Sequence, residues 1–235
     1  MVTVAHLTVS VGEKRIIHDV SISFVDKKTY AIMGPNGSGK STFVQAIIGN
    51  PIYTLSVDSR IKLDKTSLHS LSADKRAKKG IGVTFQSPLA LQGISVFQLL
   101  RLALPEVDVL KLYEQIETYA KELKIKKELL ERSLNEGASG GERKKLEVLQ
   151  MAVLNPKVVF FDEIDTGVDI DSLKTIFAFL KKIKKDKTYI FITHYSKIFD
   201  YIKPDEVIVM RQGEVVVRGQ QALVQKIEKH GYDSV

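Results

Sequence analysis

The chain has 235 residues, of which 44% are hydrophobic, so it can bury the core of one full-sized domain. Its longest apolar runs are far shorter than the roughly 20 residues that span a bilayer, and no leader pattern opens it, so we expect a soluble, cytoplasmic protein without direct membrane insertion. It has no cysteine, which excludes disulfides and thiolate sites, and its net charge of +7 lies on scattered lysines, which favours solvated helix faces over a nucleic-acid partner.

The first half of the chain begins with strands. Residues 2–9 and 20–25 alternate apolar with polar or small side chains, which predicts an antiparallel pair of half-buried strands. Residues 30–33 form a short apolar run that ends at a glycine-rich loop, residues 34–41, and residues 42–48 continue with a helical pattern. We therefore expect a strand, a loop and a helix in that order.

The second half alternates buried strands with helices. A strand at 81–85 leads into Gln86, and an apolar stripe from Leu110 to Leu123 predicts a helix. Apolar runs at 158–161, 189–193 and 207–210 are typical of a parallel sheet covered on both faces. We expect a single α/β domain, residues 1–235, with an N-terminal antiparallel β subdomain. Its catalytic core comprises 1–87 and 151–235, and its helical subdomain is 88–150.

The glycine-rich loop fits the phosphate-binding pattern G-x-x-x-x-G-K-S at every fixed position. Glycines let the backbone amides turn toward phosphates, Lys40 adds positive charge, and Ser41 offers its hydroxyl to Mg²⁺. A chance glycine-rich turn is the alternative, but the predicted strand and helix on either side argue against it. The nucleotide-binding candidates are Gly34, Pro35, Asn36, Gly37, Ser38, Gly39, Lys40, Ser41, Thr42 and Gln86.

Carboxylates follow the apolar run 158–161. Asp162 can reach a metal ion, and Glu163 can act as the base that polarises a water. Gln86 can contact Mg²⁺ and that water through its amide, although alone it would be read as a surface residue. His194, after the run 189–193, can bond a terminal phosphate and orient Glu163, although a lone histidine is more often structural. We expect Glu163, His194 and Lys40 to be catalytic and Ser41, Gln86 and Asp162 to bind Mg²⁺.

A second glycine loop, residues 138–142, precedes another helical segment. Its amides and the Ser139 hydroxyl would lie at the positive end of a helix dipole, where a phosphate is favoured. Ser139 could equally be an ordinary helix cap. The position of this loop between Gln86 and Asp162 favours phosphate binding.

The order of these motifs resembles that of the ATP-binding cassette (ABC) ATPases over nearly the whole chain. The resemblance implies that ATP and Mg²⁺ bind and that two copies close face to face on ATP. The family often places an aromatic ring against adenine, but the matching position falls near Val11, so we expect loose base selectivity. The residues assigned to the nucleotide of a second copy are Ser139, Gly140, Gly141, Glu142 and Asp169.

Longer stretches, at 139–145, 162–171 and 228–232, resemble the SufC subfamily, the ATPases of SUF iron-sulfur cluster assembly. This resemblance implies SufB-like and SufD-like scaffold partners whose shape ATP would change. It also implies a resting-state lock in which Lys144 pairs with Glu163. The alternative is the ATP-hydrolysing subunit of an ABC membrane transporter.

Overall fold

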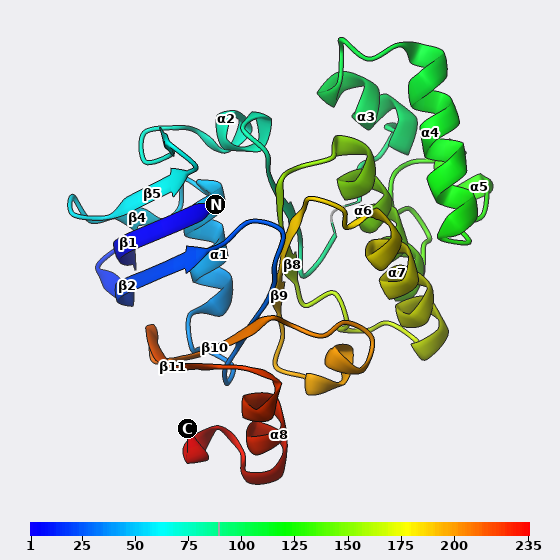
Figure 1. Cartoon of the computed structure of the whole chain (residues 1–235). Helices are drawn as coiled ribbons and strands as arrows, with labels where there is room; N and C mark the ends of the chain where they lie inside the picture. Colours follow the sequence, from blue (N-terminus) through cyan, green and yellow to red (C-terminus); the bar gives the residue numbers. More distant parts are fainter. Residues whose placement is uncertain (89) are drawn as a thin grey trace.

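A computed structural model describes residues 1–88 and 90–235 of the chain, and residue 89, inside the predicted helical subdomain, lies outside them (Figure 1). The chain folds into two sheets and the helices around them. The strands are β1 (Val2–Val11), β2 (Lys14–Phe24), β3 (Thr29–Met33), β4 (Thr54–Leu55), β5 (Arg60–Leu63), β6 (Thr66–Ser67), β7 (Ile81–Thr84), β8 (Val158–Asp162), β9 (Thr188–Ile192), β10 (Glu206–Arg211) and β11 (Glu214–Gly219). The α-helices are α1 (Lys40–Ile48), α2 (Ala73–Lys78), α3 (Val96–Ala103), α4 (Val109–Glu122), α5 (Glu128–Glu131), α6 (Gly140–Leu154), α7 (Ile170–Ile183) and α8 (Gln221–His230).

The central sheet has the strand order β11-β10-β3-β9-β8-β7. All neighbours in it are parallel except β11, which pairs antiparallel with β10. Parallel strands need crossover connections, and the apolar strands β3, β8 and β9 are buried throughout because both faces of the sheet are covered. The carboxyl ends of β3, β8 and β9 therefore come together at one edge, where loops from distant parts of the sequence meet.

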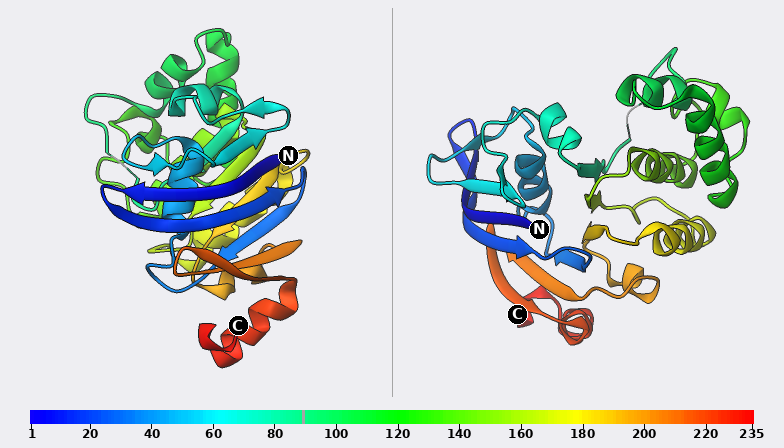
Figure 2. Two further views of the ribbon diagram at one scale, coloured as in Figure 1. Left: turned by 90° about the vertical axis from the view of Figure 1, so that its left-hand side faces the viewer. Right: turned by 45° about the horizontal axis from the view of Figure 1, so that its top comes forward.

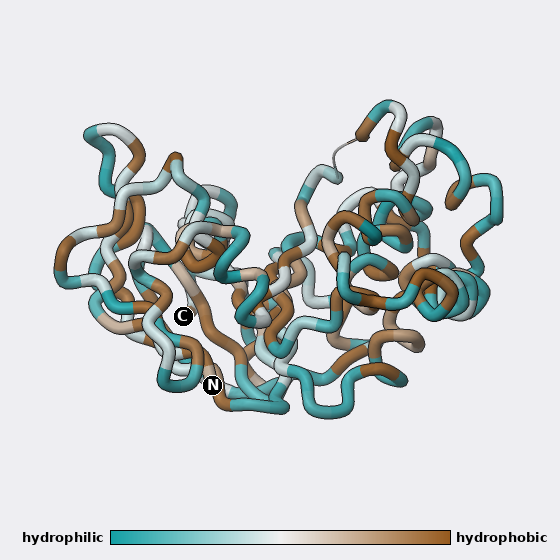
Figure 3. The backbone as a smooth tube through the Cα atoms, turned by 90° about the horizontal axis from the view of Figure 1, so that it is seen from above, coloured by the Kyte–Doolittle hydropathy of each residue, from teal (hydrophilic) through white to brown (hydrophobic). Residues whose placement is uncertain are grey.

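Side-chain alternation along these strands divides the core into two clusters. Val158 and Phe160 of β8 pack on the side of β1, β2, β5 and α1, whereas Val159 and Phe161 pack on the side of α4, α6 and α7. Strand residues alternate between faces, so β3, β8, β9 and β10 each contribute to both clusters, whereas the apolar residues of β7 belong to the first. Figure 2 shows the central sheet between the lobe that contains β1, β2, β5 and α1 and the lobe that contains α4, α6 and α7. Figure 3 shows hydrophobic stretches in each of these lobes.

The second sheet is antiparallel and has the order β2-β1-β5-β6, with β4 also paired to β1. The β1–β2 pairing shifts register three times, and His6 and Asp19 adopt positive φ angles near these shifts. Such bulges bend a strand and increase its twist. This sheet covers one side of α1, the helix that follows the glycine-rich loop (Figure 1).

The fold class predicted from the sequence is confirmed, with a parallel sheet, an N-terminal antiparallel sheet and helices between residues 88 and 150. The expected strands differ from the observed ones at their ends, most of them by only one or two residues. The strand expected at 20–25 begins at Lys14, because the alternation continues through a bulge, and the strand expected at 81–85 ends at Thr84. The elements without a sequence prediction are the short strands β4, β5 and β6, strand β11, and helices α2 and α8.

Candidate functional site

The phosphate loop, residues 34–41, joins β3 to α1 at the carboxyl edge of the central sheet. Gly34 has φ 153°, and a Cβ atom there would lie 2.2 Å from the carbonyl oxygen of Met210. Gly39 has φ 99° and caps the first turn of α1. Both positions require glycine, because a side chain would be strained at these angles and its Cβ atom would collide, at Gly34 with the backbone of β10 and at Gly39 with the side chain of Ile17, 2.7 Å away. The amides of the loop and of α1 are thereby held at one point, as phosphate binding requires.

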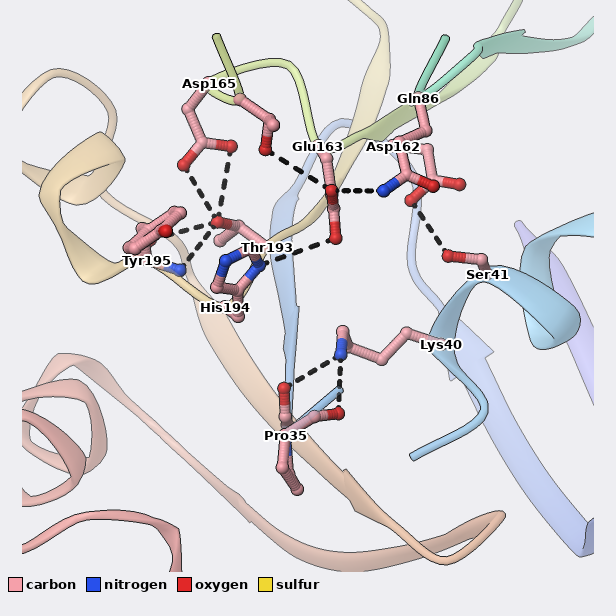
Figure 4. A network of polar contacts seen from close by, with 12 residues as sticks. Pro35, Lys40, Ser41, Gln86, Asp162, Glu163, Asp165, Thr193, His194 and Tyr195 are labelled. Atoms are coloured by element: carbon pink, nitrogen blue, oxygen red, sulfur yellow. Dashed lines mark hydrogen bonds and ion pairs between the residues drawn. The ribbon is translucent and has the colours of Figure 1, made fainter. Parts of the chain in front are cut away.

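Lys40 lies buried at the start of α1 and points back over the loop (Figure 4). Its ammonium donates hydrogen bonds to the carbonyl oxygens of Gly34, at 2.8 Å, and Pro35, at 3.0 Å. Burial lowers the pKa of Lys40, and the nearby charges of Glu163 and Asp162 oppose that effect. The side chain is therefore a fixed positive charge next to the carboxylates of β8.

Asp162 is the last residue of β8 and is 2% exposed. Burial, followed by the charge of Glu163, raises the pKa of Asp162 to about 6. The hydroxyl of Ser41 donates to its Oδ1 at 3.4 Å. The structure thus brings together Ser41 from α1 and Asp162 from β8, which lie 121 residues apart in the chain.

Glu163 follows β8 with a left-handed backbone, φ 47°, and its N–H donates to the carbonyl oxygen of Ile192 at 2.9 Å. Three side chains contact its carboxylate (Figure 4), and one of them is Thr166, whose hydroxyl donates to Oε2 at 3.3 Å. Nε2 of Gln86 donates to Oε2 at 2.6 Å, and Nδ1 of His194 lies 3.4 Å from Oε1. The proposed base is therefore held by residues from the ends of β7 and β9.

The turn that presents His194 is fixed by the residues around it. The hydroxyl of Thr193 donates to the carboxylate of Asp165 at 3.0 Å, and it accepts a hydrogen bond from the N–H of Tyr195 at 2.9 Å. The rings of His194 and Tyr195 lie 3.9 Å apart. These contacts connect the loop after β8 to the loop after β9, so Glu163 and His194 are positioned by one network.

A cavity of about 590 Å³ opens beside this network. Residues predicted from the sequence form one wall, and residues from β2 and the β10–β11 turn, which the sequence reasoning missed, form the other. Val11 is not among the described residues that line the cavity, although the sequence pointed to that position. The lining residues are Lys14, Arg15, Ile16, His18, Asn36, Gly37, Gly39, Lys40, Ser41, Thr42, Gln86, Glu163 and Gln212.

A signal for the missed wall exists in the sequence. Gln212 and Gly213 form a turn between two apolar runs, and both have positive φ. The N–H of Gly213 donates to the carbonyl oxygen of Ser38, and the N–H of His18 donates to that of Gly213, both at 3.0 Å. The β10–β11 turn therefore joins β2 to the phosphate loop.

The oxygen atoms at this edge fit Mg²⁺. The set consists of the Ser41 hydroxyl, the Asp162 carboxylate and the Gln86 amide, all hard donors. Mg²⁺ in phosphate-transferring sites is commonly held by one or two carboxylates together with the substrate phosphates. Asp162 fits such an ion well, because a buried carboxylate whose pKa is raised lacks a full compensating charge.

The second glycine loop packs against a different part of the chain. Ser139 caps α6 in a reciprocal arrangement with Glu142, so the helix-cap alternative holds locally. A Cβ atom on Gly140 would lie 2.3 Å from the carbonyl oxygen of Gly167, and one on Gly141 would lie 2.9 Å from Oδ2 of Asp169. In the described parts of the chain, none of the predicted residues of this loop lines the cavity with Lys40.

The expected pair between Lys144 and Glu163 does not form within the described ranges. Lys144 instead forms an ion pair with Glu147 at 3.3 Å and donates to the carbonyl oxygens of Phe85 and Gln86. Glu147 lies almost one helical turn further along α6 and is nearer than Glu163, whose carboxylate is taken by Gln86 and His194. The predicted resting-state lock is therefore wrong for this structure.

Comparison with known proteins agrees with this geometry. The family model described as ABC transporter matches residues 17–166. A probable ATP-dependent transporter, ycf16, of Guillardia theta is 40% identical over 240 residues, which cover 98% of this chain and 94% of the relative. The chain belongs to the ABC transporter family. A probable ABC transporter ATP-binding protein of Streptococcus pyogenes serotype M3 is 38% identical to this ABC ATPase cassette, over 98% of the cassette and 93% of the relative.

Solved structures share the fold of this ABC cassette. A dimeric ATP-binding cassette in a post-hydrolysis state, bound to ADP and Pi, has a TM-score of 0.81 at 20% identity and covers 94% of this chain and 98% of its own. A bacterial Atm1-family ABC exporter with ATP bound also has a TM-score of 0.81, at 19% identity, over 99% of this chain and 40% of the exporter chain. Among the described helices of the cassette, none is long and apolar enough to cross a membrane.

Proposed function

We propose that the cassette binds ATP and Mg²⁺ in the cavity around Lys40 and hydrolyses the ATP with Glu163 as the base. The observation that carries this proposal is the position of the Glu163 carboxylate, held between Gln86 and His194 on the cavity side of β8. The phosphate loop and the pair of Ser41 and Asp162 lie next to it. This is the set of groups that transfer of a terminal phosphoryl group to water requires.

Each group has a distinct part in the reaction. The loop amides and Lys40 would hold the outer phosphates, and Ser41, Asp162 and Gln86 would hold Mg²⁺, which neutralises charge that develops on the phosphate oxygens. Glu163 would accept a hydrogen bond from the attacking water and then its proton. Gln86 and His194 fix the Glu163 carboxylate, and His194 can also donate to the terminal phosphate.

We further propose that two copies of the cassette close on ATP, with Ser139, Gly140, Gly141 and Glu142 of one copy on the nucleotide of the other and Asp169 near the interface. Two observations support this. The second glycine loop begins the 15-residue helix α6, whose positive end favours a phosphate, and the cavity around Lys40 does not include it. A similar fold also occurs as a dimer with ADP and Pi.

We propose that the partner of this ATPase is a soluble SufB-like and SufD-like scaffold in the cytoplasm, on which iron-sulfur clusters are built. The stretches 139–145 and 162–171 support this proposal, because they resemble the SufC subfamily well beyond the general motifs. The chain lacks cysteine, so thiolate ligands for a cluster would come from partners. The second candidate is a membrane permease, and it is favoured by the names of the similar proteins of Guillardia theta and Streptococcus pyogenes, which describe probable transporters.

Hydrolysis is tested by Glu163→Gln, which preserves size and removes the base. We expect the turnover number to fall about 10²- to 10⁴-fold, the usual contribution of general base catalysis, while ATP binding stays intact and a closed dimer accumulates. Phosphate release, nucleotide titration and size-exclusion chromatography measure these outcomes. Turnover close to that of the wild type would place the base elsewhere.

The paired site is tested by Ser139→Arg, which puts a large cation where the partner's phosphate would lie. We expect binding of ATP to the single chain to persist while dimer formation and turnover are lost. Lys40→Ala is the matched comparison, because it should weaken ATP binding itself. Normal turnover by the Ser139→Arg variant would refute the shared site.

The client is tested by purifying the native complex and identifying its partners. Soluble partners that carry iron and sulfide support the scaffold. A polytopic membrane protein in their place would support the transporter.

A further inference from the structure

A buried ion pair lies on α6, outside the groups assigned so far. Lys144 Nζ is 3.3 Å from Oε2 of Glu147, and the side chains are 3% and 8% exposed, the lowest combined exposure of any ion pair in the described part of the chain. Burial raises the pKa of Glu147. Buried charges are costly unless they are paired and hydrogen-bonded, so the partners of this pair need an explanation.

The two side chains hold one stretch of backbone. Oε1 of Glu147 accepts a hydrogen bond from the N–H of Phe85 at 2.9 Å, and Lys144 donates to the carbonyl oxygens of Phe85 and of Gln86. These two residues follow the last residue of β7, Thr84, so they lie past the end of the strand. Phe85 is 45% exposed and provides little packing of its own. Polar contacts from α6 therefore fix this stretch.

The backbone at residues 85 and 86 matters because it carries the side chain of Gln86, which contacts Glu163. The side chain of Gln86 donates to Oε2 of Glu163 at 2.6 Å, yet Gln86 is itself an exposed residue. An exposed glutamine samples several rotamers, so its amide stays on the carboxylate only if its backbone is held. A continuous set of bonds thus runs from α6 through residues 85 and 86 to the proposed base.

We infer that Lys144 and Glu147 are positioning residues for hydrolysis: they hold the backbone at residues 85 and 86 so that Gln86 keeps the Glu163 carboxylate aimed into the cavity. The inference rests on the proposed role of Glu163. Because α6 starts at the second glycine loop, the same bonds connect the loop proposed to meet the partner's nucleotide with the base that acts on this chain's own nucleotide. Glu147 has no other assigned role.

The test is an epistasis experiment on the full chain. The variants are Glu147→Gln, Lys144→Met, the double variant with both changes, and each of these combined with Gln86→Ala. The double variant is decisive, because it removes both charges and leaves none buried alone. Single-turnover ATP hydrolysis and ATP affinity are measured on the fraction that elutes as folded protein.

With Gln86 present, we expect the hydrolysis rate of the double variant to fall about ten- to a hundredfold, as small misplacements of catalytic groups do, with ATP affinity changed less than about twofold. In the Gln86→Ala background, the same changes should lower the rate no further. Lys182→Met is the matched control, since it removes an ion pair of 2.9 Å with Glu122 that reaches no residue of the site, and its rate should match that of the wild type.

The alternative outcomes are distinct. If the wild type hydrolyses ATP and Glu163→Gln does not, the proposed function stands. The inference is then overturned if the double variant hydrolyses ATP at the wild-type rate. It is also overturned if the double variant lowers the rate of the Gln86→Ala protein by the same factor as it lowers the rate of the wild type. If Glu163→Gln hydrolyses ATP at the wild-type rate, the proposed role of Glu163 as the base is refuted, and the inference is refuted with it.

Discussion

Asp162 illustrates how a site can be built at the expense of stability. Its pKa rises from 3.8 in the unfolded chain to about 6 in the fold, mainly through burial. Well above pH 6 the carboxylate is ionised in the folded and in the unfolded chain, but it is poorly solvated in the fold. It therefore lowers the free energy of unfolding by the amount that corresponds to the full difference between its folded and unfolded pKa values. At 1.36 kcal/mol per pKa unit, this amounts to about 3 kcal/mol.

Asp162→Asn replaces this carboxylate with a neutral group of the same shape, whose oxygen can still accept from Ser41. In buffer with EDTA at pH 7.5, we expect the variant to be more stable than the wild type by up to about 3 kcal/mol, although it should lose Mg²⁺-dependent turnover. The gain should shrink to about 1 kcal/mol at pH 4.5, since the wild-type carboxyl group is then protonated in the fold.

Urea unfolding at both pH values measures the gain, and Asp58→Asn, at an exposed carboxylate, is the control that should change little. The reasoning is refuted if Asp162→Asn destabilises the fold at pH 7.5. It is also refuted if the gain is the same at both pH values, because a packing effect would not follow protonation.

Two further predictions concern the loops and helices around the site. Arg76→Met should lower the free energy of unfolding by about 3–5 kcal/mol in urea titrations, because the buried guanidinium donates to the carbonyl oxygens of Ala46 and Ile47 at the end of α1, and both oxygens would lose this charged donor. A loss below about 1 kcal/mol would contradict this role. Gly140→Ala should leave ATP binding to the single chain unchanged but reduce turnover more than about tenfold, because the added Cβ atom would displace Gly167. Phosphate release measures the turnover, and a rate equal to that of the wild type would disprove this prediction.

The parts of the fold that the sequence predicted are those with strong local patterns. The apolar runs of β3, β8 and β9 are buried on both faces, so their patterns alone predict strands, and the phosphate loop is defined by fixed glycines. The antiparallel sheet was predicted only in part. Strands β4 and β6 have two residues each, too few for any periodicity, and they exist because β1 and β5 are there to pair with them.

The parts of the site that were missed depend on contacts between distant residues. Phe85 and Glu147 are 62 positions apart, and no spacing rule links a backbone amide to a carboxylate at that distance. Lys144 was expected to reach Glu163 and reaches Glu147 instead, because two acceptors compete and only the packing of α6 decides between them. Ile16 and Gln212 belong to the cavity wall only because the β10–β11 turn folds back onto the phosphate loop.

The partition of the core by the central sheet separates two properties of the site that could be tuned independently. Asp162 continues the alternation of Val158 and Phe160, whose side faces α1 and Ser41, whereas Gln86 and the ion pair that holds it belong to the side of α6. A change of volume beneath α6 should therefore act first on Gln86, and so on the Glu163 carboxylate and on one of the three proposed Mg²⁺ ligands, whereas a change beneath α1 should act first on Ser41 and Asp162. Variation in the helical lobe would then adapt the rate of hydrolysis to a partner while the pair of Ser41 and Asp162 stays in place.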